Sequence, residues 1–115
     1  MECYENLANA IIEKAVGDYK TAILYLHYIK NNKFEIIQQI VDRSANLQNP
    51  IHYTSLELQA LYNQKVQAAK KEVLNIESFF YSQWYQALTK VDGKTLMRRV
   101  KEQIKEQKGI DCDLL

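Results

Sequence analysis

The feature that most constrains this chain is a long stretch without helix breakers. Neither proline nor glycine occurs between Thr54 and Asp92, and apolar residues recur there at helical spacing. That spacing places side chains on one face of an α-helix. The pattern predicts a helix from Ser55 to Thr89, opened by a capping box of Thr54 and Glu57. Its apolar stripe consists of Tyr62, Val66, Ala69, Val73, Ile76, Phe80 and Ala87.

This predicted helix is too long for a compact domain. At 1.5 Å per residue it would extend over about 50 Å, whereas a compact domain of this chain length is only about 35 Å across. We therefore expect it to project from the domain, to kink, or to run along another chain.

A second stripe predicts another long helix over residues 4–30. Every second member is alanine, which lets another backbone approach closely. We expect the helix to end at Asn31-Asn32, because asparagine tolerates the left-handed conformation that ends many helices. The stripe consists of Ala8, Ile12, Ala15, Tyr19, Ala22, Leu26 and Ile29.

Two shorter helices complete the predicted fold, over residues 34–43 and 94–107. Between the first of them and the long helix we expect a loop over 44–53, which Pro50 marks. Asp92 is a suitable N-cap for the last helix, and Gly109 a suitable end. The prediction is a single all-α domain over 1–115, with flexible ends at 1–3 and 110–115. Its two long helices form an antiparallel hairpin or bundle, and we expect the protein to be oligomeric.

Composition excludes several classes of protein. The chain has 115 residues, of which 47% are hydrophobic and 25% charged, which is typical of one folded domain rather than a disordered chain. One proline and three glycines argue against a turn-rich β-sandwich. No apolar run is long enough to span a bilayer, and no signal-peptide pattern is present. We expect a cytoplasmic protein of a bacterial host cell, in which Cys3 and Cys112 are reduced thiols rather than a disulfide.

Patterns typical of catalysis are missing from the sequence. His27 and His52 lack neighbours at metal-ligand spacing, and no nucleophile elbow, phosphate-binding glycine loop or HExxH motif occurs. The sequence therefore predicts a non-enzymatic protein without metal or cofactor, in which His27 belongs to an aromatic surface.

Aromatic residues are the candidates for binding a partner. The chain has eight tyrosines, three phenylalanines and one tryptophan, and seven of these twelve lie where both long helices become apolar around most of their circumference. Tyrosine and tryptophan suit a docking surface, because each combines a large apolar face with a polar tip. The alternative is that these side chains form ordinary core. The predicted partner-binding residues are Tyr25, Tyr28, Tyr81, Trp84 and Tyr85.

Charge is distributed unevenly along the chain. Residues 90–108 contain seven basic and three acidic side chains, whereas residues 1–18 contain four acidic residues and one lysine. Lys94, Arg98 and Arg99 are the alternative candidates, for contacts to phosphate in a nucleic acid or a nucleotide. Acidic residues interspersed in this last helix, and the overall charge of +1, argue against a dedicated DNA-binding protein.

Two segments resemble small helical proteins encoded by phages and prophages of low-GC Gram-positive bacteria. The first comprises Leu7–Ile12, Ala15-Val16, Asp18-Tyr19 and Ala22; the second comprises Ile76–Phe80, Ser82, Trp84-Tyr85, Leu88-Thr89, Asp92-Gly93 and Leu96. The resemblance implies a helical fold and an origin in a mobile element, and it implies no mechanism.

The resulting hypothesis is a phage-type interaction protein that binds and occludes a host protein of the defence or replication machinery. A counter-defence inhibitor resembling an anti-CRISPR protein is its most specific form, and we expect a homodimer or higher oligomer. One alternative is an oligomeric sponge that sequesters cyclic nucleotide immune signals. Another is a nucleic-acid-binding accessory factor that uses the basic C-terminal helix.

Overall fold

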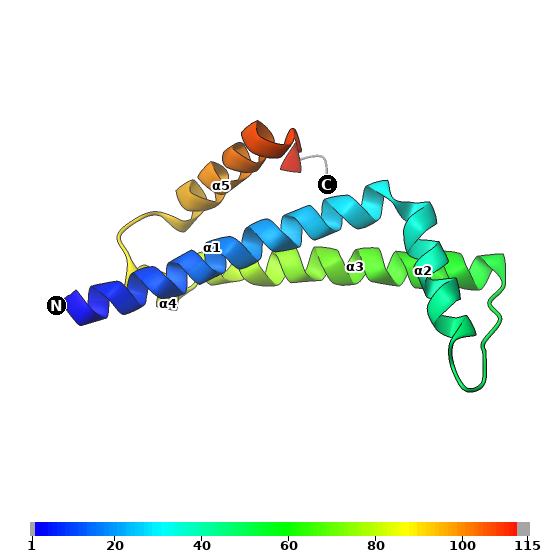
Figure 1. The fold of residues 1–115 in the computed structure, drawn as a ribbon. Helices are drawn as coiled ribbons and strands as arrows, with labels where there is room; N and C mark the ends of the chain where they lie inside the picture. The colour runs from blue at the N-terminus through cyan, green and yellow to red at the C-terminus, as the bar shows by residue number, and fades with distance from the viewer. Residues whose placement is uncertain (1, 113–115) are drawn as a thin grey trace.

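The computed structural model describes residues 2–112, with side chains from Glu5 onward, and that range contains five helices and no strand (Figure 1). The helices are α1 (Glu2–Asn31), α2 (Lys33–Ala45), α3 (Ser55–Phe80), α4 (Gln83–Leu88) and α5 (Gly93–Lys108). The long helices α1 and α3 pack along each other. They are antiparallel, because Tyr19 contacts Glu77 whereas Tyr62, nearer the start of α3, contacts Ile29. The predicted all-α fold with two long helices is confirmed.

Side-chain amides satisfy the last carbonyl groups of α1. The amides of Asn31 and Asn32 donate to the carbonyl oxygens of His27 and Tyr28, each at 2.8 Å. The buried Tyr62 hydroxyl donates to the Ile29 carbonyl at the same distance. No residue other than glycine has a positive φ among the described residues. The helix therefore ends where predicted, but not through the left-handed conformation that we expected.

The helix predicted over 55–89 is interrupted. It begins as predicted, since Glu57 N–H donates to Thr54 Oγ1 at 3.2 Å and Thr54 N–H to Glu57 Oε1 at 3.1 Å. It ends at Phe80, and Ser82 then caps α4 by accepting from Tyr85 N–H at 3.1 Å. A serine cap therefore breaks the helix without proline or glycine, and the prediction of one continuous helix is wrong.

Helix α5 is held against α3 by a close backbone approach. A Cβ atom on Gly93 would lie 2.0 Å from the carbonyl oxygen of Phe80, so only glycine fits. Asp92 caps the helix by accepting from Thr95 N–H at 3.1 Å, and Gly109 ends it with a φ of 69°. Both ends of α5 are those predicted.

The core consists of two clusters of apolar side chains. One joins α1, α3, α4 and α5 and contains Tyr19, Ile23, Phe80, Tyr85, Met97, Val100, Ile104 and Ile110. The other joins α1, α2 and α3 and contains Leu26, Ile29, Ile36, Tyr62 and Ala69. Cys112 packs against the first cluster, whereas residues 113–115 and the side chain of Cys3 lie outside the described range. The flexibility of the ends stays a prediction.

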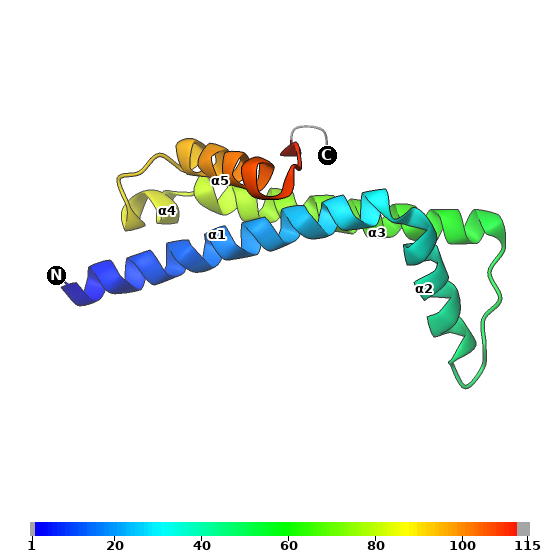
Figure 2. The same ribbon diagram turned by 45° about the horizontal axis from the view of Figure 1, so that its top comes forward.

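The molecule is elongated, and the two sides of its long helical pair are covered differently. Its Cα radius of gyration is 18.2 Å, whereas a compact domain of this length has about 13 Å. Figures 1 and 2 show α5 along one side of the α1–α3 pair, while α2 projects from the opposite side at the far end. Between residues 2 and 112, no helix is long and apolar enough to cross a membrane.

Candidate functional site

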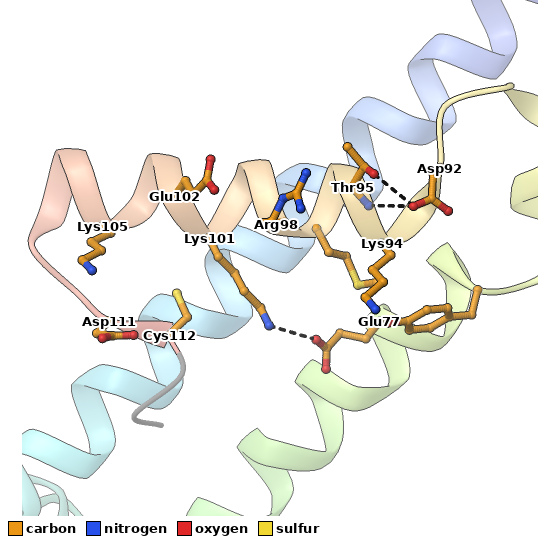
Figure 3. Close-up of a pocket in the computed structure, with 12 residues that line it drawn as sticks. Glu77, Asp92, Lys94, Thr95, Arg98, Lys101, Glu102, Lys105, Asp111 and Cys112 are labelled. Atoms are coloured by element: carbon orange, nitrogen blue, oxygen red, sulfur yellow. Dashed lines mark hydrogen bonds and ion pairs between the residues drawn. The ribbon is translucent and has the colours of Figure 1, made fainter.

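A polar pocket of about 710 Å³ opens between α3 and α5 (Figure 3). Its charged lining consists of four cations and four carboxylates: Lys94, Arg98, Lys101, Lys105, Glu77, Asp92, Glu102 and Asp111. The four cations follow spacings of four, three and four along α5, which places them on one face of that helix. The pocket thus has the size of a ligand site and a balanced formal charge.

Glu77 anchors the inner wall of this pocket. Its Oε2 atom accepts a hydrogen bond from the Tyr19 hydroxyl at 2.7 Å and lies 3.8 Å from Lys101 Nζ. Burial, together with this hydrogen bond, raises the pKa of Tyr19 far above its usual range, so the phenol keeps its proton. Glu77 therefore joins α1, α3 and α5.

Tyr81 connects the aromatic and the charged candidates. It is the residue directly after α3, 61% of it is exposed, and it lines the same pocket as Lys94 and Arg98. Arg99 is exposed and does not line this pocket, because one residue corresponds to about 100° around a helix. The structure thus brings Tyr81, Lys94 and Arg98 together and separates Arg99 from them.

Tyr85 does not belong to an exposed surface. It is 1% exposed and lies in the core, with its ring centroid 5.8 Å from that of Phe79 and 5.5 Å from that of Phe80. Its hydroxyl has no hydrogen-bond partner among the described residues. Burial raises its pKa, and the charge of Asp92 adds to the increase. As a partner contact Tyr85 is a wrong prediction, since a buried side chain cannot reach a partner.

The other three aromatic candidates are exposed but lie apart. Trp84 is 59% exposed and packs edge-on against Phe79, with 5.6 Å between the ring centroids. Tyr25 is half-exposed in a groove between α1 and α3, on a different part of the surface from Tyr81. Tyr28 lies at the corner of α1 and α2, where a hydrogen bond to Glu35 raises its pKa. These residues do not form one continuous surface with Tyr81.

The histidines occupy different surroundings. His27 is half-buried in α1, where its ring Nδ1 lies 3.2 Å from the Asn31 amide nitrogen, and His52 is exposed in the loop before α3. Among the described residues, no group of three His, Cys, Asp or Glu side chains is placed to hold a metal ion.

Sequence reasoning missed the contributions of Glu77, Lys101 and Lys105 to the pocket. The helical spacing of the α5 cations was a signal for their common face. No comparable signal showed that α5 folds back over Glu77, because that depends on the close approach of Gly93 to Phe80. Comparisons with protein-family models, curated proteins and solved structures found no match to this chain.

Proposed function

We propose that this chain is a non-enzymatic, phage-type interaction protein that binds and occludes a protein of its bacterial host. In its most specific form it is a counter-defence inhibitor resembling an anti-CRISPR protein. The host partner docks on the turn between α3 and α4 and on the adjoining face of α5. Tyr81, Trp84, Lys94 and Arg98 provide the principal contacts.

One observation carries this proposal: an exposed tyrosine lies at a charge-balanced pocket that also contains an arginine. Tyrosine, tryptophan and arginine are the residue types that dominate binding energy at protein interfaces. Trp84 adds a further exposed aromatic ring three residues from Tyr81. The resemblance to phage-encoded helical proteins supports a host protein as the partner.

The balance of charge favours a protein partner over a polyanion. Glu77, Asp92, Glu102 and Asp111 would repel a phosphate group that approached Lys94 or Arg98. A protein surface carries both acidic and basic side chains, so it can pair with both kinds of charge in the pocket.

Affinity capture with matched variants tests this proposal. The immobilised wild-type chain, Tyr81→Ala, Trp84→Ala and the control Leu56→Ala are exposed to lysate of a low-GC Gram-positive bacterium. Leu56 is 85% exposed at the start of α3, far along that helix from Tyr81, so its substitution removes apolar surface elsewhere. We expect a host protein that wild type and Leu56→Ala retain and that both aromatic variants lose.

A biological readout accompanies the capture. Expression of the wild-type chain in a bacterium with active immunity is expected to restore phage plaques. Expression of Tyr81→Ala is expected to leave immunity active, so that no plaques form. Retention of every captured protein by both aromatic variants, with all variants folded by circular dichroism, would contradict the proposed surface.

A second candidate function has one specific observation in its favour. Tyr81 and Arg98 line one pocket of about 710 Å³, where a base could stack on the ring and a phosphate could pair with the guanidinium. This arrangement would suit a sponge for cyclic nucleotides. Thermal-shift measurements with cyclic di- and trinucleotides test it, since a ligand at a hundred times its Kd adds about 2.7 kcal/mol. A shift that Arg98→Gln abolishes would favour this function over the first.

A further inference from the structure

The exposed charges of the pocket between α3 and α5 include a row of alternating sign. Arg98, Glu102 and Lys105 all line the pocket and are exposed, and steps of four and three residues keep them on one face of α5 (Figure 3). Along this row, positive, negative and positive charges follow one another over a rise of about 10.5 Å. We call these three residues the charge row.

Other charges of the pocket already have partners within the protein. Lys101 is half-buried, and Figure 3 shows its side chain pointing toward Glu77, whose Oε2 atom lies 3.8 Å from Lys101 Nζ. The same carboxylate accepts the hydrogen bond from Tyr19. Asp92 accepts from the backbone N–H and the hydroxyl of Thr95, at 3.1 and 3.0 Å. No ion pair within residues 2–112 engages the charge row, so its three side chains can pair with another molecule.

The spacing of the charge row selects the kind of segment that can pair with it. Its two cations lie seven residues apart, which corresponds to about 10.5 Å along the axis of α5. Residues on one face of a β-strand lie about 7 Å or about 13 Å apart, so an extended segment cannot face both cations at once. A helix that lies along α5 can, because its residues seven positions apart share one face and the same rise.

We propose that the host partner docks on the charge row through a helix whose charges are the inverse of the row. Two acidic residues of that helix, seven positions apart, pair with Arg98 and Lys105. A basic residue between them, three or four positions from each, pairs with Glu102. Tyr81 lines the same pocket and packs against an apolar residue of the helix. The pairing rests on the proposed function, since the helix belongs to the host partner that Tyr81 binds.

The alternating signs also determine which partners the charge row disfavours. A nucleic-acid backbone or a uniformly acidic peptide places negative charge against Glu102, and like charges repel. A uniformly basic segment is repelled by Arg98 and Lys105 in the same way. A helix with the inverse pattern meets an opposite charge at all three positions, so the row gives specificity as well as attraction.

Two synthetic peptides of inverse charge test the pairing. The matching peptide is an alanine-based helix that carries Glu, Lys and Glu at the spacings of the charge row, and the inverted peptide carries Lys, Glu and Lys there. In fluorescence anisotropy, wild type is expected to bind the matching peptide about tenfold more tightly, because three exposed ion pairs each contribute modestly. The triple variant Arg98→Glu, Glu102→Lys, Lys105→Glu is expected to reverse this preference. Equal affinities for the two peptides, or a preference that the triple variant leaves unchanged, would overturn the proposal.

A matched control and the capture experiment separate the charge pairing from other effects. Arg99→Glu makes the same charge change as Arg98→Glu about 100° around the helix, outside the pocket, and should leave the peptide preference unchanged. In capture from lysate, Arg98→Glu and Lys105→Glu should each lose the host protein that Tyr81→Ala loses. If both folded charge variants retain that protein, the charge pairing is wrong while the proposed function stands. Retention of every captured protein by Tyr81→Ala and Trp84→Ala would instead overturn both.

Discussion

The Tyr19 hydroxyl donates a hydrogen bond of 2.7 Å to Glu77 Oε2, and the same oxygen lies 3.8 Å from Lys101 Nζ. Three helices that are distant in sequence therefore meet at one carboxylate oxygen. The contact fixes α5 over α1 and α3, and so it determines the inner wall of the pocket that Tyr81 and Arg98 share.

Removal of the Tyr19 hydroxyl is expected to destabilise the fold. Tyr19 is completely buried, and a hydrogen bond to a charged group contributes about 1.5–3 kcal/mol. Tyr19→Phe should lower the free energy of unfolding in urea by that amount. The control Tyr25→Phe removes a hydroxyl from a half-exposed ring and should leave the free energy of unfolding unchanged. Equal stability of the two variants would contradict the role assigned to Glu77.

Stability is expected to fall as the pH rises above about 10, where tyrosines of the unfolded chain lose their protons. Burial raises the pKa of Tyr19 and of Tyr85, so the folded state holds both protons over a range in which the unfolded state releases them. Each tyrosine then lowers the free energy of unfolding by at most about 1.4 kcal/mol per pH unit. Urea titrations between pH 8 and 11.5 should show that the free energy of unfolding falls less steeply with pH for Tyr19→Phe than for wild type. An equally steep fall for both would contradict the raised pKa of Tyr19.

Tyr85→Phe and Tyr85→Ala are expected to differ sharply in their effect on stability. Its hydroxyl has no hydrogen-bond partner among the described residues, so Tyr85→Phe should leave stability unchanged or raise it. Tyr85→Ala removes a buried aromatic ring and should cost about 3–5 kcal/mol. Denaturation midpoints measure both effects. A loss above about 1 kcal/mol for Tyr85→Phe would show that the hydroxyl has a partner in solution.

Two glycines are expected to respond in opposite directions to alanine. A Cβ on Gly93 meets the Phe80 carbonyl at 2.0 Å, so Gly93→Ala should displace α5 and lower the melting temperature. A Cβ on Gly17 has nothing within 4 Å, and alanine is favoured over glycine inside a helix by about 1 kcal/mol. Gly17→Ala should therefore raise the melting temperature. A melting temperature that Gly93→Ala leaves unchanged or raises would contradict the packing of α5 described above.

The helices could be predicted from the sequence because their signals are local. The capping box at Thr54, the cap at Asp92 and the end at Gly109 each involve residues within a few positions of one another. The break at Ser82 was missed because the apolar stripe continues through it, and only the serine cap marks it.

The missed helix break at Ser82 also explains why Tyr85 was wrongly predicted to lie on an exposed surface. In one continuous helix, Tyr81 and Tyr85 would lie four residues apart on the same face. The break changes the direction of the chain between them, so Tyr81 is 61% exposed and Tyr85 only 1%. The shared pocket of Tyr81 and Arg98 likewise depends on tertiary contacts, at Gly93 and Glu77, that no local pattern encodes.

Our central proposal is that a host protein docks on the turn between α3 and α4, through the exposed Tyr81 and Trp84. Affinity capture from bacterial lysate on the immobilised wild-type chain, Tyr81→Ala, Trp84→Ala and the control Leu56→Ala tests it most directly. The account predicts a host protein that the wild-type chain and Leu56→Ala retain and that both aromatic variants lose. Retention of every captured protein by both aromatic variants, with all variants folded, would contradict it.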